Sequence, residues 1–251
     1  MIKPFLTLLL FVLLLPFVCR GQERIVLEDW LHHAENFLDK TDSYTGLFHK
    51  QERVKGYLKT KETVYLEFKK PFKIYMRWVE GPGKGREIIY VDGWNNNRIL
   101  IREPGALGVV NMNLRPQGPL AMSGSRHPIT EAGLHHLVTL LGAHLRRGLR
   151  LGDLEYQDNG EEFIYGRKTR KTEVIFSQDK TRGYYCFRTI LHLDRDWKIP
   201  IRTQVYDWTN VLVEDYGYEQ LRFDAGLADA DFYLRNSKRN FEGRPQVIHP
   251  E

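Results

Sequence analysis

Five short runs in the first half of the chain alternate apolar and polar residues with a period of two. Such alternation is typical of β-strands that bury one face. Gly81-Pro82-Gly83 and Asp92-Gly93 supply turns between runs, so we expect neighbouring strands to pair antiparallel. Similar runs follow in the second half. The predicted strands are residues 44–48, 63–68, 73–78, 88–91, 98–101, 162–165, 172–176, 184–193, 200–208 and 213–223.

Two other segments have the spacing of amphipathic helices. The first places its apolar residues between Leu27 and Leu38. The second is expected to start at Pro128, to end near Arg147 and to be capped by Gly148. Its apolar stripe comprises Leu134, Val138, Leu141 and Leu145, widened by Leu137 and Leu140. We therefore predict an α+β fold, in which two main helices pack on one face of a large curved antiparallel sheet.

The N-terminal residues have the features of an export signal. Lys3 precedes an apolar run at residues 5–18, which is shorter than the roughly 20 residues that span a membrane. We expect cleavage after Gly21, which gives a signal peptide at residues 1–21, a single domain at residues 22–251 and a periplasmic location. Lipid anchoring through Cys19 is a less favoured alternative, because Val18 is larger than the residue that such processing prefers.

Charge and cysteine content narrow the function classes. Removal of the signal peptide lowers the net charge from +5 to +3, and the charge is spread along the chain. This pattern does not fit a nucleic-acid-binding protein; at most it favours loose contact with an anionic membrane surface. Cys186 is then the remaining cysteine, so no internal disulfide is expected. A buried structural thiol is the favoured interpretation.

No motif indicates catalysis or metal binding. The turn at residues 81–86 lacks the spacing of a phosphate-binding loop, although Lys84 and Arg86 could contact lipid headgroups. The histidines include adjacent pairs rather than pairs four residues apart, so neither a metal nor another cofactor is expected. We therefore do not expect an enzyme. Five carboxylates are interpreted as a solvated face: Asp194, Asp196, Asp207, Glu214 and Asp215.

The segment 103–128 is rich in Gly and Pro and is too long for a simple connection, so we expect a mobile or functional loop. It ends at Arg126-His127-Pro128, where the second helix is predicted to begin. Two interpretations stay open for this cluster. In one, Pro128 starts the helix and Arg126 binds neighbouring carbonyls. In the other, the cluster gates a binding site or recognises a headgroup.

Several short motifs, in a fixed order, resemble the LolA-like superfamily of periplasmic lipoprotein carriers, their outer-membrane acceptors and RseB-type stress sensors. They are residues 48–51, Pro71-Phe72, residues 76–78, Val91-Asp92-Gly93 and the closing residues 227–232. A closer resemblance, carried by residues 51–54, 71–75, 83–93 and 125–133, is to the bacterial domain-of-unknown-function family number 1571. The resemblance implies an open half-barrel whose apolar concave face is covered by helices. The carriers have Arg where this chain has Lys70, which departs from their pattern.

Together these observations predict an extracytoplasmic protein that binds a hydrophobic ligand, either a lipid or an acyl chain, as a lipid or lipoprotein carrier does. The alternative is a periplasmic sensor or scaffold that binds an envelope protein in stress signalling. In the first case the ligand is expected to lie between the concave face and the second helix. The predicted ligand-binding residues are Leu134, Leu137, Val138, Leu141, Arg126, His127 and Lys70.

Overall fold

A computed structural model describes residues 20–105 and 108–232. The predicted signal peptide falls outside these ranges except for its last two residues, and Cys19 falls outside them entirely. Within the described ranges, no helix combines the length and apolar character needed to cross a membrane.

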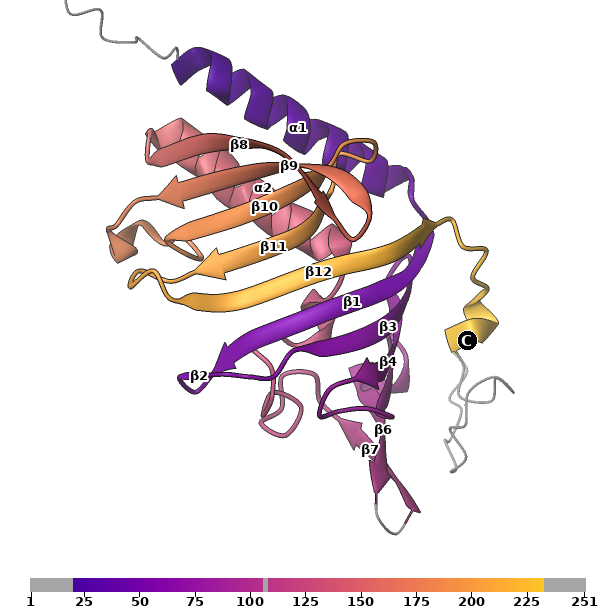
Figure 1. Cartoon of the computed structure of the whole chain (residues 1–251). Helices are drawn as coiled ribbons and strands as arrows, with labels where there is room; N and C mark the ends of the chain where they lie inside the picture. The colour runs from indigo at the N-terminus through magenta and orange to yellow at the C-terminus, as the bar shows by residue number, and fades with distance from the viewer. Residues whose placement is uncertain (1–19, 106–107, 233–251) are drawn as a thin grey trace, which may run out of the picture.

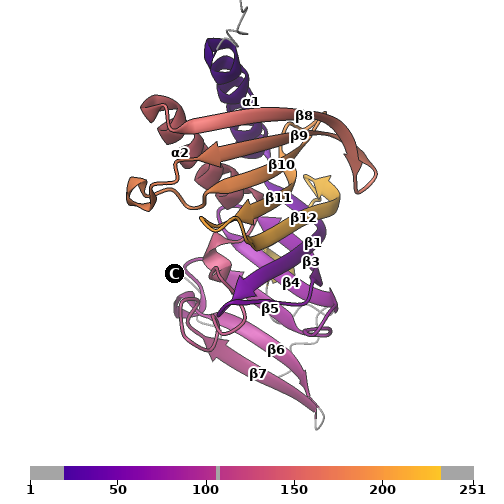
Figure 2. The ribbon, with the colours of Figure 1, turned by 60° about the vertical axis from the view of Figure 1, so that its left-hand side comes forward.

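Twelve strands form one curved antiparallel sheet (Figure 1). Eleven of them follow the order β7-β6-β5-β4-β3-β1-β12-β11-β10-β9-β8, and β2 pairs only with β1. Figure 2 shows the strands fanning from β8 at one edge to β7 at the other. The strands are β1 (Ser43–Val54), β2 (Tyr57–Leu58), β3 (Glu62–Lys69), β4 (Lys73–Glu80), β5 (Glu87–Val91), β6 (Ile99–Gly105), β7 (Gly108–Leu114), β8 (Leu154–Ile164), β9 (Arg167–Phe176), β10 (Arg188–Asp194), β11 (Pro200–Tyr206) and β12 (Leu212–Phe223).

The first and last strands of the chain join its two halves. β1 pairs with β12 in a register that sets Phe48 opposite Tyr218 and Glu52 opposite Glu214. The other edge of β1 pairs with β3, so the strands before and after the second helix belong to one sheet. The sheet does not close, because β7 and β8 do not pair with each other. The predicted α+β fold with a large, open antiparallel sheet is confirmed.

Two helices, α1 (Arg20–Lys40) and α2 (Leu134–Leu151), contact each other and lie alongside the β8–β11 part of the sheet (Figures 1 and 2). Their apolar stripes are buried in the same core as the concave side of the sheet. An ion pair between Arg146 and Glu35, at 2.5 Å, also connects them. The short 3-10 helices are η1 (Asn95–Asn97), η2 (Ile129–Glu131), η3 (Lys180–Arg182) and η4 (Asp229–Phe232).

The second helix differs from its prediction at both ends. Pro128 precedes the 3-10 turn η2 rather than α2 itself. Gly133 then takes φ +101°, a conformation that side chains with a Cβ rarely adopt, so α2 starts only at Leu134. At the other end α2 continues past the predicted cap, and Gly152, with φ 70°, ends it in the left-handed conformation.

Part of the predicted loop is regular structure. β6 continues to Gly105 and pairs with β7, so residues 99–114 include a hairpin rather than an open connection. The irregular segment that remains, residues 115–128, leads into η2. Its residues Pro116, Leu120, Ser123 and Ser125 lie on the cavity described below.

The closing residues pack on the opposite face of the sheet. Phe232 in η4 is fully buried against Tyr75, Ile89 and Val91. These strand residues alternate with concave-face residues, as the period-two pattern requires.

Candidate functional site

A cavity of about 650 Å³ lies between the concave face of the sheet and α2. Such a volume is within the range of about 300–1,000 Å³ that small-molecule pockets occupy. Its walls are largely apolar. β3 to β6 contribute Val64, Met76, Ile99 and Ile101, β7 contributes Met112 and Leu114, and α2 contributes Leu137, Leu140 and Leu141.

The spacing of apolar residues on α2 explains why this helix can both pack and line a cavity. Leu134, Val138 and Leu145 are at most 2% exposed and belong to the core. Leu137 and Leu140 are half-buried and face the cavity. The apolar face of α2 is therefore wider than packing against the sheet alone requires.

The structure brings some of the predicted ligand-binding residues to the cavity. Leu137, Leu141 and His127 line it. Leu134, Val138 and Arg126 lie next to it rather than on its wall: the two apolar residues are core residues, and Arg126 contacts Glu214, which is itself a lining residue. Whether these residues bind a ligand stays a prediction.

Lys70 has a different environment. Its Nζ donates hydrogen bonds to the backbone carbonyls of Leu38, at 2.9 Å, and Asp39, at 2.7 Å. These carbonyls lie in the last turn of α1, where a cation is favoured by the helix dipole. Lys70 is not among the cavity-lining residues of the described chain.

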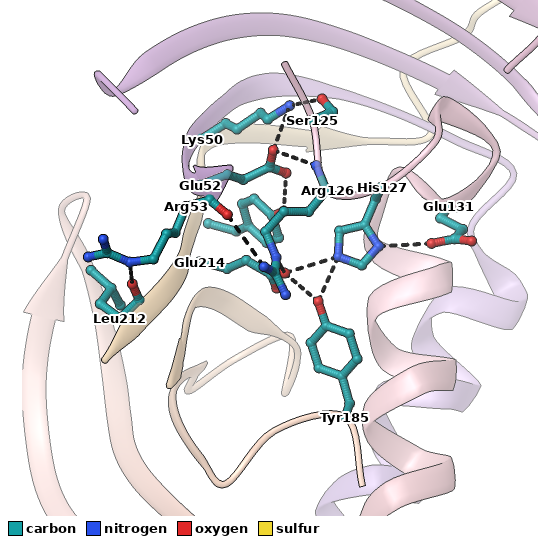
Figure 3. Close-up of polar contacts among 11 residues, drawn as sticks. Lys50, Glu52, Arg53, Ser125, Arg126, His127, Glu131, Tyr185, Leu212 and Glu214 are labelled. Carbon is teal, nitrogen blue, oxygen red and sulfur yellow. Dashed lines mark hydrogen bonds and ion pairs between the residues drawn. The ribbon is translucent and has the colours of Figure 1, made fainter. Parts of the chain in front are cut away.

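A group of buried polar residues, here called the Glu214 cluster, lies on the cavity wall (Figure 3). Its centre is the carboxylate of Glu214, whose side chain is 3% exposed. It accepts a hydrogen bond from Arg126 Nε at 2.5 Å and another from the Tyr185 hydroxyl. His127 Nε2 lies 3.1 Å from the same carboxylate oxygen. The cluster comprises Glu52, Arg126, His127, Tyr185, Glu214 and Tyr216.

Glu52 is the second buried carboxylate of the cluster, and its side chain is 3% exposed. It accepts hydrogen bonds from the backbone N–H of Arg126, at 2.9 Å, and from the Tyr216 hydroxyl. Lys50 Nζ lies 3.3 Å away and also donates to Ser125 Oγ. Residues 125–127 are thus bound to β1 through Glu52 and to β12 through Glu214, which fixes the end of the loop beside the cavity (Figure 3).

The electrostatics of the cluster favour an ion pair between His127 and Glu214. Burial alone would lower the pKa of His127, but the Glu214 and Glu131 carboxylates outweigh it and the pKa is raised. Burial would likewise raise the pKa of Glu214, but hydrogen bonds from His127, Tyr185 and Arg126 outweigh it and the pKa is lowered. The Nδ1 of His127 lies 2.8 Å from Glu131 Oε2, so a protonated ring can donate from both nitrogens.

The prediction that the five carboxylates form a solvated face is wrong for two of them. Glu214 is 2% exposed and Asp194 is 1% exposed. Asp194 accepts from Arg167 Nη2, at 2.9 Å, and from the backbone N–H groups of Asp196 and Trp197. These donors satisfy the charge that burial would otherwise leave without hydrogen bonds.

Sequence reasoning missed Glu52, Tyr185 and Glu214. The position of Glu214 could have been inferred from strand alternation, because residues 214, 216 and 218 point to the same face of the sheet. Tyr216 and Tyr218 are large inward-facing residues, so Glu214 had to face the cavity as well. The same reasoning applies to Glu52, which shares its face with Phe48 and Lys50.

The thiol of Cys186 lies on the cavity wall, but the residue is only 5% exposed. Burial raises the pKa of this thiol to about 12, as expected for the predicted structural thiol. Among residues 20–105 and 108–232, no three His, Cys, Asp or Glu residues are grouped to hold a metal ion.

The sequence model described as "Protein of unknown function (DUF1571)" matches residues 41–241. None of the curated proteins matches the sequence.

Several solved structures are similar in fold. The complex of MucA and MucB from Pseudomonas aeruginosa contains a chain that is 18% identical, with a TM-score of 0.44 and coverage of 82% of this chain and 59% of that chain. In a second structure, of MucB, this chain covers 62% of the length of the MucB chain. Lipoprotein LppX from Mycobacterium tuberculosis is 12% identical, with a TM-score of 0.49 and coverage of 81% and 98%. A LolA superfamily protein from Nitrosomonas europaea is 12% identical, with a TM-score of 0.33 and coverage of 82% and 96%.

Proposed function

This chain belongs to the DUF1571 family of proteins of unknown function, as its motifs predicted, and we propose that it binds a lipid or acyl chain in the cavity between its sheet and α2. The observation that carries the proposal is the cavity itself, whose walls carry aliphatic side chains on both the sheet side and the helix side, next to the polar Glu214 cluster. The aliphatic part of this wall favours the burial of hydrocarbon, and the buried polar residues of the Glu214 cluster are already hydrogen-bonded to one another.

The energetics agree with reversible binding. An acyl chain of about 16 carbons gains roughly 13 kcal/mol when it is buried, at about 0.8 kcal/mol per CH₂. Association costs about 4–15 kcal/mol in lost freedom of motion. The difference corresponds to a modest affinity, which suits a protein that both takes up and releases its ligand.

We propose that this function operates outside the cytoplasm, in a single domain at residues 22–251, on the basis of the predicted export signal at residues 1–21. Because no catalytic motif supports an enzyme, binding is proposed as the whole activity. N-terminal sequencing of the exported protein tests this location, because a free N-terminus near Gln22 is expected. A blocked N-terminus at an acylated Cys19 would instead indicate a protein anchored to the membrane.

The test is a displacement titration of a fluorescent fatty acid on delipidated protein. Saturable binding at micromolar concentrations is expected. Leu137→Asp puts a carboxylate on the cavity wall from a half-buried position and should weaken binding by at least about tenfold, because a buried charge without a partner is costly. Thr139→Asp is the matched control, since Thr139 is exposed on the same helix, and it should leave the affinity unchanged.

Thermal unfolding of both variants separates loss of binding from loss of fold. Well-folded wild-type protein that binds neither fatty acids nor phospholipids would refute the proposal and favour the protein-partner alternative. Equal weakening by Leu137→Asp and Thr139→Asp would show that the ligand binds elsewhere.

A further inference from the structure

The turn between β1 and β3 combines basic and apolar side chains. Residues 55–61 read Lys-Gly-Tyr-Leu-Lys-Thr-Lys, with three lysines and no acid. Tyr57 is 76% exposed and Leu58 is 39% exposed. All three lysines are exposed, and the described residues provide no ion pair for any of them. Basic and apolar side chains therefore face solvent together at this turn.

A second basic turn lies against the first. Gly81 is so close that a Cβ on it would meet the Lys61 carbonyl oxygen at 3.0 Å. The turn that Gly81 opens carries Lys84, which is also exposed. Nearby acids are fewer than the lysines: Glu62 lies against Gly81 and Gly83, Glu80 accepts a hydrogen bond from Thr63, and Glu103 pairs with Arg86. The two turns thus form a patch with an excess of positive charge.

This patch surrounds the cavity mouth. Lys59, Thr60 and Pro82 are exposed and also line the cavity, so the cavity reaches solvent between the two turns. Leu120, from the loop on the other side, lines the cavity as well and is 60% exposed. We define the mouth rim as residues 55–61, residues 81–84 and Leu120. β2 lies within the first turn. In Figure 1 it is found at the end of β1 that is farther from α1.

We propose that the mouth rim docks on an anionic lipid membrane surface, so that a ligand passes directly between the bilayer and the cavity. The lysines match anionic headgroups, and Tyr57, Leu58 and Leu120 are side chains that enter the interfacial layer favourably. A soluble anion would be attracted by the lysines alone and would make no use of the exposed apolar residues. The inference deepens the proposed function, but docking itself requires no bound ligand.

Vesicle flotation tests the docking. Wild-type protein should float with vesicles of equal parts phosphatidylcholine and phosphatidylglycerol, and not with phosphatidylcholine alone. Added salt should release it. Each lysine near an anionic surface contributes about 1 kcal/mol, which is about fivefold in partitioning. Lys55→Glu/Lys61→Glu should therefore lower partitioning by more than about tenfold.

The matched control is Lys40→Glu/Arg222→Glu, which makes the same charge change in exposed residues at the other end of β1. It should keep wild-type partitioning within about twofold, because those residues lie beyond the reach of the docked surface. An equal loss in both variants would mean that overall charge, not the mouth rim, attracts the protein, and would overturn the proposal.

A third variant, Tyr57→Ser/Leu58→Ser, keeps every lysine. This variant should no longer partition to the vesicles, but it should bind soluble polyglutamate as the wild type does. Unchanged partitioning would show an electrostatic contact with any polyanion, an acidic protein included, rather than docking on lipid.

Fatty-acid titration without vesicles separates the two proposals. Lys55→Glu/Lys61→Glu should bind fatty acid as the wild type does. Failure of flotation with intact fatty-acid binding refutes only the docking, whereas flotation without fatty-acid binding refutes only the proposed function.

Discussion

Glu214 and His127 show how single residues fix the end of the loop beside the cavity. The folded state raises the pKa of His127, so its protonation stabilises the fold. This contribution is complete below the unfolded pKa of about 6.5 and is lost as pH rises through the folded value. The pKa of Glu214 is lowered, so its contribution is present above the unfolded value of about 4.3 and is lost as pH falls through the folded value.

The His127 contribution by itself favours mildly acidic solution, whereas burial lowers the pKa of His135, His136, His144 and His192, whose contributions favour a higher pH. We therefore predict that the stability of the wild type relative to His127→Gln, measured by urea denaturation from about pH 5 to about pH 9, is greatest in mildly acidic solution and falls on the alkaline side. The exposed His33, whose Nδ1 contacts a backbone carbonyl within α1, offers the control substitution His33→Gln. A stability difference between wild type and His127→Gln that does not change with pH would contradict the assignment to His127.

The sequence singled out Arg126 and His127 but not their partners. Their position before a predicted helix was visible along the chain, whereas Glu52 and Glu214 come from strands 162 residues apart that only the fold brings together. The β1–β12 register places these carboxylates opposite each other. When the pairing of these two strands is not known, Glu52 and Glu214 each resemble an ordinary surface carboxylate.

At the scale of elements, the start of α2 depends on one contact with the sheet. The Tyr44 hydroxyl, fully buried, accepts a hydrogen bond from the backbone N–H of Leu134 at 2.9 Å. A Cβ at Gly133 would lie 2.6 Å from that hydroxyl. Glycine at this position therefore serves two purposes: it permits φ +101° and it leaves space for Tyr44.

Gly133→Ala should lower the free energy of unfolding by about 1–3 kcal/mol through backbone strain, and further through the clash. Tyr44→Phe should cost about 1–3 kcal/mol, since it leaves a buried N–H without an acceptor. In the double variant the clash is absent, so its loss should be smaller than the sum of the single losses. Strictly additive values in chemical denaturation would contradict the proposed contact.

Most elements followed from periodicity, and the exceptions have physical causes. Each predicted strand and helix overlaps an observed one, but the bounds differ: α2 begins and ends later than expected, β8 begins at Leu154 rather than at residue 162, and residues 184–187, predicted as strand, are irregular and precede β10. β7 was missed because its residues, Gly108 to Leu114, are bounded by glycines and a nearby proline and resembled a loop. Their strand structure comes from pairing with β6, which is a tertiary effect.

At the scale of the whole molecule, the two halves of the sheet share one core. Ile99 in β6 and Leu191 in β10 belong to the same buried cluster as residues of α1 and α2. β1 and β12 carry the backbone pairing between the halves. Because buried residues of both halves share this cluster with the two helices, we expect the described part of the chain to unfold as one cooperative unit.

The buried thiol of Cys186 provides a local probe for this last prediction, since it lies in the second half and reacts only when exposed. Ile99→Ala, in the first half, should lower the free energy of unfolding by about 2–5 kcal/mol. Alkylation of Cys186 in urea should report the same decrease as circular dichroism. Val110→Ala, at a residue 54% exposed on edge strand β7, should change both by less than about 0.5 kcal/mol. If Ile99→Ala shifted the dichroism transition but left the Cys186 transition in place, the halves would unfold independently, and the shared core would not hold them together.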